Sequence, residues 1–217
     1  MKQLANIQRI RDWVITAEAW WYDVRHNVRT RADRGEEELS ITGDLSRGFW
    51  YRPVRPATAR ALLNDLPIQD YSDYTFVDFG SGKGRMLLMA ANYPFRRIEG
   101  VELRKDLHDA AVDNLRRYRK STKKFPRRRI QCLNMDATSY DFPDENMVLY
   151  FFNPFGEEIM QKILNRLDLS LTQNPRDIIL VMLYPQFASP ADGLMNVKRL
   201  KETGHYRFYR SCAPMGA

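Results

Sequence analysis

Residues 76–85 read FVDFGSGKGR, a short apolar run that contains an acid and is followed by glycine at every second position. The run predicts a strand, and the glycines predict a tight turn whose backbone N–H groups can approach a ligand without obstruction by Cβ. Glu102 follows Gly80 by 22 residues and ends the run Gly100-Val101-Glu102. A carboxylate about 20 residues after such a turn, at the tip of the next strand, is placed to bind a ribose diol. The pattern therefore predicts a site for a nucleoside cofactor.

The spacing of the glycines excludes two classes of nucleotide site. A dinucleotide site needs a third small residue at position 85, which here is Arg85. A phosphate-binding P-loop needs Ser or Thr after Gly82-Lys83 and a glycine at position 77, but these positions are Gly84 and Val77.

The remaining pattern, Asp-x-Gly-x-Gly-x-Gly over residues 78–84, resembles motif I of the class I S-adenosylmethionine-dependent methyltransferases. That cofactor carries an ammonium and a sulfonium and has no phosphate, so an acid suits it. The resemblance implies S-adenosyl-L-methionine as the cofactor. The cofactor-binding residues that it implies in this part of the chain are Asp78, Gly80, Ser81, Gly82, Gly84, Glu102 and Leu103.

Two downstream segments extend the resemblance. Residues 130–135 predict a third strand that ends in Asp136-Ala137, where the family has an acid that bonds the adenine amino group and a small residue that packs on the ring. The continuous apolar run 146–152 predicts a parallel strand covered on both faces. It leads into Asn153-Pro154-Phe155, which is similar to motif IV.

Motif IV carries the implied chemistry. The Asn153 side-chain oxygen could accept hydrogen bonds from an amino group and orient its lone pair toward the methyl, so Asn153, Pro154 and Phe155 are the predicted catalytic residues, with Asn153 also at the cofactor. Amino-group methyltransferases have Asn-Pro-Pro-aromatic here, whereas this chain has one proline. That departure leaves lysine, arginine and small amines open as acceptors beside adenine and glutamine.

Each acid has a structural alternative. Asp78 could cap the helix that follows it, Glu102 could pair with Arg104 or Lys105, and Asp136 could start an ordinary Asx-turn. Their shared position at predicted strand ends favours the site.

Trp50-Tyr51-Arg52-Pro53 resembles an aromatic-x-Pro segment that folds over the methionine end of the cofactor in some bacterial relatives. Arg52 stands where Glu or Gln is expected. Tyr51 is therefore a candidate lid residue that binds the cofactor, and a core tyrosine is the alternative.

The remaining periodicity predicts an α/β fold. Strands alternate with helices up to residues 178–183, and 195–200 with 206–211 predict an antiparallel hairpin. Together they predict a doubly wound, mostly parallel sheet. The family resemblance implies the seven-stranded, Rossmann-like methyltransferase fold, in which the last strand lies antiparallel between the fifth strand and the edge. Residues 1–50 are expected to form an N-terminal helical extension and a loop, and 51–217 the methyltransferase domain. Within the extension, the predicted buried stripe is Ile7, Ile10, Val14, Ala17 and Trp21.

Composition excludes several classes of protein. The 217 residues are 44% hydrophobic, and no stretch approaches the roughly 18 uncharged apolar residues of a membrane span. Asp12 and Glu18 interrupt any secretory signal, so a cytoplasmic location is expected. Two cysteines and three scattered histidines predict neither a disulfide framework nor a metal site.

The positive charge is concentrated in one segment. The formal net charge is +7, and residues 116–129 alone carry nine Lys and Arg side chains interleaved with Tyr118 and Phe125. This segment could dock nucleic acid or another acidic partner away from the chemistry, or it could be a solvated connector.

The sequence thus predicts a cytoplasmic methyltransferase that acts on an amino or other heteroatom acceptor, with a protein side chain ahead of RNA and small molecules. A module that binds the cofactor without catalysis is the alternative.

Overall fold

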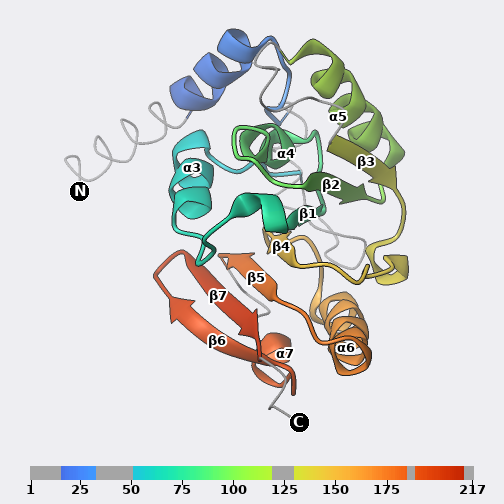
Figure 1. Ribbon diagram of the computed structural model, residues 1–217. Helices are drawn as coiled ribbons and strands as arrows, with labels where there is room; N and C mark the ends of the chain where they lie inside the picture. Colours follow the sequence, from blue (N-terminus) through green and yellow to red (C-terminus); the bar gives the residue numbers. More distant parts are fainter. Residues whose placement is uncertain (1–15, 33–50, 119–129, 185–188, 213–217) are drawn as a thin grey trace, which may run out of the picture.

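The computed structural model describes residues 16–32, 51–118, 130–184 and 189–212. Its centre is a seven-stranded sheet in the order β3-β2-β1-β4-β5-β7-β6 (Figure 1). Only β7 breaks the parallel arrangement, pairing antiparallel with β5 and β6. This is the predicted doubly wound topology. The strands are β1 Thr75–Phe79, β2 Arg97–Glu102, β3 Ile130–Asn134, β4 Met147–Phe151, β5 Ile178–Leu183, β6 Val197–Glu202 and β7 Tyr206–Ser211.

Helices cover both faces of the sheet. A core on one face joins a helix over residues 16–26 to α3 and α4, and a second core on the other face is closed by α6. The helices are α3 Pro56–Asn64, α4 Arg85–Ala90, α5 Lys105–Arg117, α6 Glu157–Gln173 and α7 Ser189–Asp192, with short 3-10 helices η2 Tyr71–Asp73 and η4 Ala137–Ser139.

The central strands are buried along their whole length. Every residue of β1, β4 and β5 is inside, which explains why their sequences are continuous apolar runs rather than alternating ones. At one edge, β6 buries only Val197 and exposes lysine and arginine side chains, which disfavour pairing with another strand.

One helix ends earlier than the sequence predicts. A proline cannot continue a helix, so Pro94 predicts a helix that runs from Arg85 to Tyr93, but α4 ends at Ala90. Asn92 explains the difference, because its Nδ2 donates to the carbonyls of Leu88 and Met89 at 3.0 and 3.1 Å and so satisfies the end of the helix.

The N-terminal helix faces the core with a different side than predicted. Trp21 is 55% exposed, whereas Tyr22, Asp23 and His26 are buried. Asp23 turns inward because it is the partner of a buried arginine described below. The predicted residues Ile7, Ile10 and Val14, and the loop over 34–50, lie outside the described residues.

The part of the extension that is described packs on the main domain. Tyr22 and Val28 belong to the same core as α3 and α4. Among the described helices, no segment has the length and apolar character needed to cross a membrane. Within the same residues, no group of three or more His, Cys, Asp or Glu side chains is placed to hold a metal ion.

Candidate active site

The glycine turn between β1 and α4 has the backbone conformation that its sequence demands. Gly80, Gly82 and Gly84 have φ of +76°, +53° and +81°, which side chains disfavour. The N–H groups of Gly80 and Ser81 both donate to the Val101 carbonyl, at 2.9 and 3.1 Å. The prediction that these N–H groups reach a ligand is therefore wrong. They tie the turn to β2, so they are not free to bind a phosphate. This agrees with a cofactor that has no phosphate group.

The missing Cβ atoms of this turn make room for two predicted site residues. A Cβ on Gly82 would lie 2.2 Å from Tyr51 Cε2, and one on Gly80 would lie 2.6 Å from Pro154 Cβ. Tyr51 and Pro154 are 103 residues apart in the chain, yet both close on this turn. The third glycine, Gly84, lets α4 approach Ala111 of α5, to whose Cβ its own would lie 3.1 Å away.

Asp78 is a buried carboxyl near the end of β1. It is 3% exposed, and no residue that the structure describes donates a hydrogen bond to it. Burial, and secondarily the nearby charge of Glu102, hold the pKa of Asp78 well above its usual value. It does not cap α4, because the N-cap is Gly84 without a side-chain bond.

Glu102 closes the other side of the turn. Its Oε2 accepts the Gly82 N–H and its Oε1 accepts the Arg104 N–H, both at 2.9 Å. The expected alternative, an ion pair with the side chains of Arg104 or Lys105, does not form, because these pair with Asp106 and Asp109. Each carboxylate oxygen keeps a second lone pair for a ligand hydroxyl.

A row of polar groups surrounds Asp78 on its face of the sheet. Gly100 and Tyr150 are its register partners on β2 and β4, and Cys132 is the partner of Gly100 on β3. The Tyr150 hydroxyl is buried without a hydrogen-bond partner in the described chain, as is the Ser81 Oγ. Burial and the charge of Asp78 raise the pKa of the Cys132 thiol to about 11 and raise that of Tyr150 as well. A cationic ligand group, such as the ammonium of the predicted cofactor, would stabilise the ionised form of Asp78 in this cluster.

Ligand binding here should be linked to pH. Since the pKa of Asp78 is raised in the folded protein, the ligand-free fold loses stability as pH rises from about 4 through that raised value. An ammonium favours the ionised carboxylate, so binding of S-adenosylhomocysteine should release a proton and tighten as pH rises through the same window. Calorimetry in two buffers of different ionisation enthalpy measures the release. Asp78→Asn should abolish it, and equal heats in both buffers for the wild-type protein would contradict the prediction.

The predicted adenine contacts lie one strand further out. Asp136 Oδ1 accepts the Thr138 N–H at 2.8 Å and its hydroxyl at 2.7 Å, and these bonds lower the pKa of Asp136. This is the Asx geometry considered as its alternative, and it leaves Oδ2 for a ligand. Ala137 is buried and Leu103 is 65% exposed. Their role at the cofactor remains a prediction.

Motif IV follows β4 in an uncommon conformation. Asn153 has φ of +47°, and Tyr184, just past the end of the neighbouring β5, has φ of +48°. Strain of this kind concentrates at functional sites. Asn153 does not cap α6, whose N-cap is Gly156, and its amide makes no hydrogen bond to the described residues.

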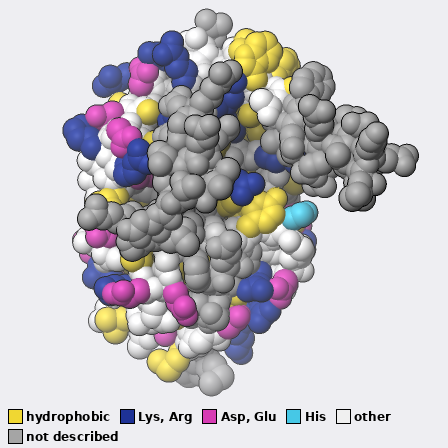
Figure 2. All heavy atoms as spheres, turned by 180° about the vertical axis from the view of Figure 1, so that it is seen from behind, with side chains coloured by type: hydrophobic (Ala, Val, Ile, Leu, Met, Phe, Trp, Pro, Cys, Tyr) yellow, Lys and Arg dark blue, Asp and Glu magenta, His cyan; other side chains and the backbone are white. Residues whose placement is uncertain are grey.

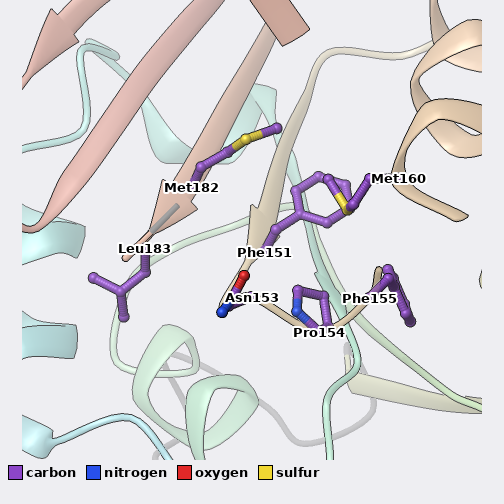
Figure 3. Close-up of a pocket in the computed structure, with 7 residues that line it drawn as sticks. All are labelled: Phe151, Asn153, Pro154, Phe155, Met160, Met182 and Leu183. Atoms are coloured by element: carbon purple, nitrogen blue, oxygen red, sulfur yellow. The ribbon is translucent and has the colours of Figure 1, made fainter. Parts of the chain in front are cut away.

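A small pocket opens beside Asn153. Its cavity volume is about 10 Å³, which is room for about one water molecule, and it is partly open to solvent. In Figure 3 the Asn153 amide lies between Leu183 and Pro154, with Phe155 beyond the proline. Phe152, which directly precedes motif IV and could wall the methyl group beside Phe155, is not among the residues that line this pocket. It contacts the Tyr184 ring at a centroid distance of 5.8 Å. The pocket is lined by Phe151, Asn153, Pro154, Phe155, Met160, Met182 and Leu183.

The sequence did not single out Tyr150, Tyr184 or Met182. Tyr150 carries a weak signal, as a hydroxyl inside an otherwise apolar run, but its link to Asp78 depends on strand register. Tyr184 and Met182 could be recognised only after β5 is placed beside β4.

The basic segment is largely outside the described residues, which resume at 130. Tyr118, expected to interleave with its charges on the surface, is 2% exposed and belongs to the core, so it cannot stack on a partner. Figure 2 shows basic and acidic side chains interspersed over the described surface of one face.

Similar proteins are methyltransferases of several kinds. The structure resembles a predicted N6-adenine-specific DNA methylase from Listeria monocytogenes (TM-score 0.52, 15% identity, 82% of this chain and 55% of that one). It also resembles the 23S rRNA methyltransferase ErmE (TM-score 0.50, 14% identity, 73% and 68%) and the StiE O-MT structure (TM-score 0.51, 12% identity, 74% and 75%). The chain thus has the fold of the class I S-adenosylmethionine-dependent methyltransferases, as its motifs predict.

One curated relative is similar in sequence. The chain is 27% identical over 195 residues to a histone-lysine N-methyltransferase, H3 lysine-79 specific, from Dictyostelium discoideum. The match covers 87% of this chain but only 10% of that much longer protein. No protein-family model matches the chain.

Proposed function

We propose that this protein is an S-adenosylmethionine-dependent methyltransferase that acts on an amino or other heteroatom acceptor. The observation that carries the proposal is the edge of the sheet at Asp78, where a buried carboxyl that receives no hydrogen bond from the described residues lies beside Glu102 and one loop away from Asn153. The class I fold supports the proposal. The glycine turn supports it too, because the N–H groups of Gly80 and Ser81 are bonded to the Val101 carbonyl and so are not free to bind a phosphate.

The residues divide into two groups around the turn. Asp78 would take the cofactor ammonium, Glu102 the ribose hydroxyls, and Asp136 with Ala137 the adenine. Tyr51 would cover the methionine end, since it already packs on Gly82. When bound, the cofactor supplies an electrophilic methyl group on a sulfonium.

The chain's own contribution to the transfer is alignment and exclusion of water. Holding a nucleophile in line near the methyl carbon can supply about 7 to 11 kcal/mol of the barrier reduction. The Asn153 oxygen would accept an N–H of the acceptor and so direct its lone pair, while Pro154 and Phe155 would keep water out. The lining of the pocket is mostly apolar, which is compatible with the alkyl part of an amine acceptor.

Among acceptors, a protein side chain is the first candidate. The curated relative is named as a histone-lysine methyltransferase, and the mostly apolar lining of the pocket is compatible with a lysine stem. RNA and small molecules are the alternatives. The basic segment 116–129 would bind an acidic partner at a separate place, away from the chemistry. A cytoplasmic location completes the proposal.

The test has two stages. Calorimetry with S-adenosylmethionine, S-adenosylhomocysteine and NAD in parallel should give binding for the first two alone. Transfer of a labelled methyl to fractionated lysate, with and without protease or ribonuclease treatment, then assigns the acceptor class. Binding of NAD instead would overturn the cofactor, and tight cofactor binding with no labelled acceptor would favour the non-catalytic module.

Loss of the ribose clamp should weaken the cofactor strongly. Glu102→Ala removes the acceptor for ribose hydroxyls and frees the Gly82 N–H, so affinity for S-adenosylhomocysteine should fall by about 1.5 to 3 kcal/mol. The matched control is Glu99→Ala on the same strand. Glu99 is equally buried but bonds Tyr140 and Arg97, so its loss should lower stability and leave affinity within about twofold. Equal effects of the two variants on calorimetric affinity would contradict the clamp.

A further inference from the structure

Arg85, the residue that rules out a dinucleotide site, is a buried guanidinium directed at the N-terminal segment. Its side chain is 2% exposed. Nε donates to Thr30 Oγ1 at 2.7 Å and Nη1 donates to the Val54 carbonyl at 3.2 Å. Nη2 lies 3.6 Å from Asp23 Oδ1, so the charge is paired. The first residue of α4 is therefore tied to three points far from it in sequence.

Asp23 organises the chain that follows its helix. Its Oδ2 accepts the N–H groups of Thr30 and Arg31, at 2.9 and 3.2 Å, and its Oδ1 accepts the Thr30 hydroxyl at 2.6 Å. We call residues 29–31 the strap. Thr30 in the strap is fully buried, and so are Asp23 and Arg85, the two residues that bond its hydroxyl. These hydrogen bonds are therefore shielded from water.

The strap is bonded along the glycine turn. Asn114 of α5 accepts the Arg29 N–H at 2.7 Å and donates to the carbonyls of Arg29 and Lys83, at 3.0 and 2.9 Å. Lys83 Nζ donates to the Arg31 carbonyl at 3.2 Å. Arg31 of the strap is thus bonded to Lys83 of the turn directly, and Arg29 is bonded to it through Asn114.

The strap also fixes the predicted lid. The Tyr51 hydroxyl donates to the Thr30 carbonyl at 2.6 Å, and the Tyr51 ring occupies the space over Gly82 and under the Lys83 ammonium, 5.0 Å away. The position of this ring therefore depends on Thr30, and Thr30 depends on Asp23 and Arg85.

We propose that Arg85 and Asp23 are positioning residues of the cofactor site: they hold the strap, and through the Thr30 carbonyl the strap holds Tyr51 over the glycine turn. Part of the N-terminal extension then belongs to the site itself. The inference rests on the proposed cofactor and adds residues that determine its affinity through the position of Tyr51.

The direct test compares two tyrosine hydroxyls. Tyr51→Phe removes the bond to Thr30 and keeps the ring, whereas Tyr71→Phe removes an equivalent 2.6 Å bond to the Leu63 carbonyl ahead of β1. In calorimetry with S-adenosylhomocysteine, Tyr51→Phe and Thr30→Val should bind about tenfold more weakly. Tyr71→Phe should stay within twofold, even if its melting temperature falls as far.

A second measurement keeps the proposal testable where Arg85→Met or Asp23→Asn does not fold. By reciprocity of coupled equilibria, S-adenosylhomocysteine should slow hydrogen exchange of the Thr30 and Arg31 amides in the wild-type protein by about tenfold. In Tyr51→Phe this protection should disappear. A strap that serves stability alone would exchange at one rate with and without the ligand, and that result, or wild-type affinity in Tyr51→Phe and Thr30→Val, overturns the inference. Failure of the wild-type protein to bind overturns the cofactor assignment instead.

Discussion

Gly82→Val is expected to abolish measurable binding of S-adenosylhomocysteine, a loss of at least about 100-fold. The new Cβ would lie 2.2 Å from Tyr51 Cε2, so the ring must leave the turn. Valine at φ of +53° also strains the turn by roughly 1 to 3 kcal/mol. The Gly82 N–H that Glu102 accepts would shift with it, which disturbs the predicted ribose clamp from a second side.

The control for this variant is Gly204→Val in the β6–β7 hairpin. A Cβ there meets no atom within 4 Å and φ is not positive, so binding should remain at the wild-type level. Thermal unfolding of both ligand-free variants separates strain from site damage. For Gly82→Val a fall in melting temperature of about 2 to 12 °C is expected, because about 1 to 3 kcal/mol shifts the melting temperature of a chain this long by about 2 to 4 °C per kcal/mol. Normal binding by Gly82→Val would show that the turn does not form a cofactor site.

The parallel sheet could be predicted because its physics is local. Strands covered on both faces must be continuously apolar, so 76–79, 146–152 and 178–183 stand out between polar loops. The glycine turn could be predicted for the same reason, because only glycine adopts a positive φ at three alternate positions without a steric cost. The acids at strand ends then follow from the sheet itself.

The use of the turn's N–H groups could not be predicted. A glycine-rich turn is compatible with N–H groups that point at a ligand or back at the next strand, and here Gly80 and Ser81 bond Val101. The choice depends on how β2 sits against β1. In the same way, the helix pattern placed Trp21 inside by spacing, while the ion pair between Asp23 and Arg85 turned the helix so that Trp21 faces outward. A buried pair 62 residues apart leaves no periodic signal.

Asn153 could be needed for either of two reasons, its side-chain amide or its backbone conformation. The sequence offers its amide as the acceptor of an N–H, while the backbone at φ of +47° asks for a residue that tolerates the left-handed region. Asparagine does both, since it enters this region more readily than other residues except glycine. A single alanine substitution would therefore confuse the two roles.

The pair Asn153→Ala and Asn153→Gly separates them. If the amide orients the acceptor during transfer, both variants should lower kcat and kcat/KM together by about 10- to 1,000-fold, with cofactor affinity unchanged within a few fold. If only the backbone matters, glycine should restore activity and alanine should not. Asn27, at φ of +58° outside the site, calibrates the comparison: the stability difference between Asn27→Ala and Asn27→Gly gives the cost of the conformation alone. Single-turnover transfer to the identified acceptor, measured with thermal unfolding on the same preparations, decides the matter, and full activity in Asn153→Gly would remove the amide from the mechanism.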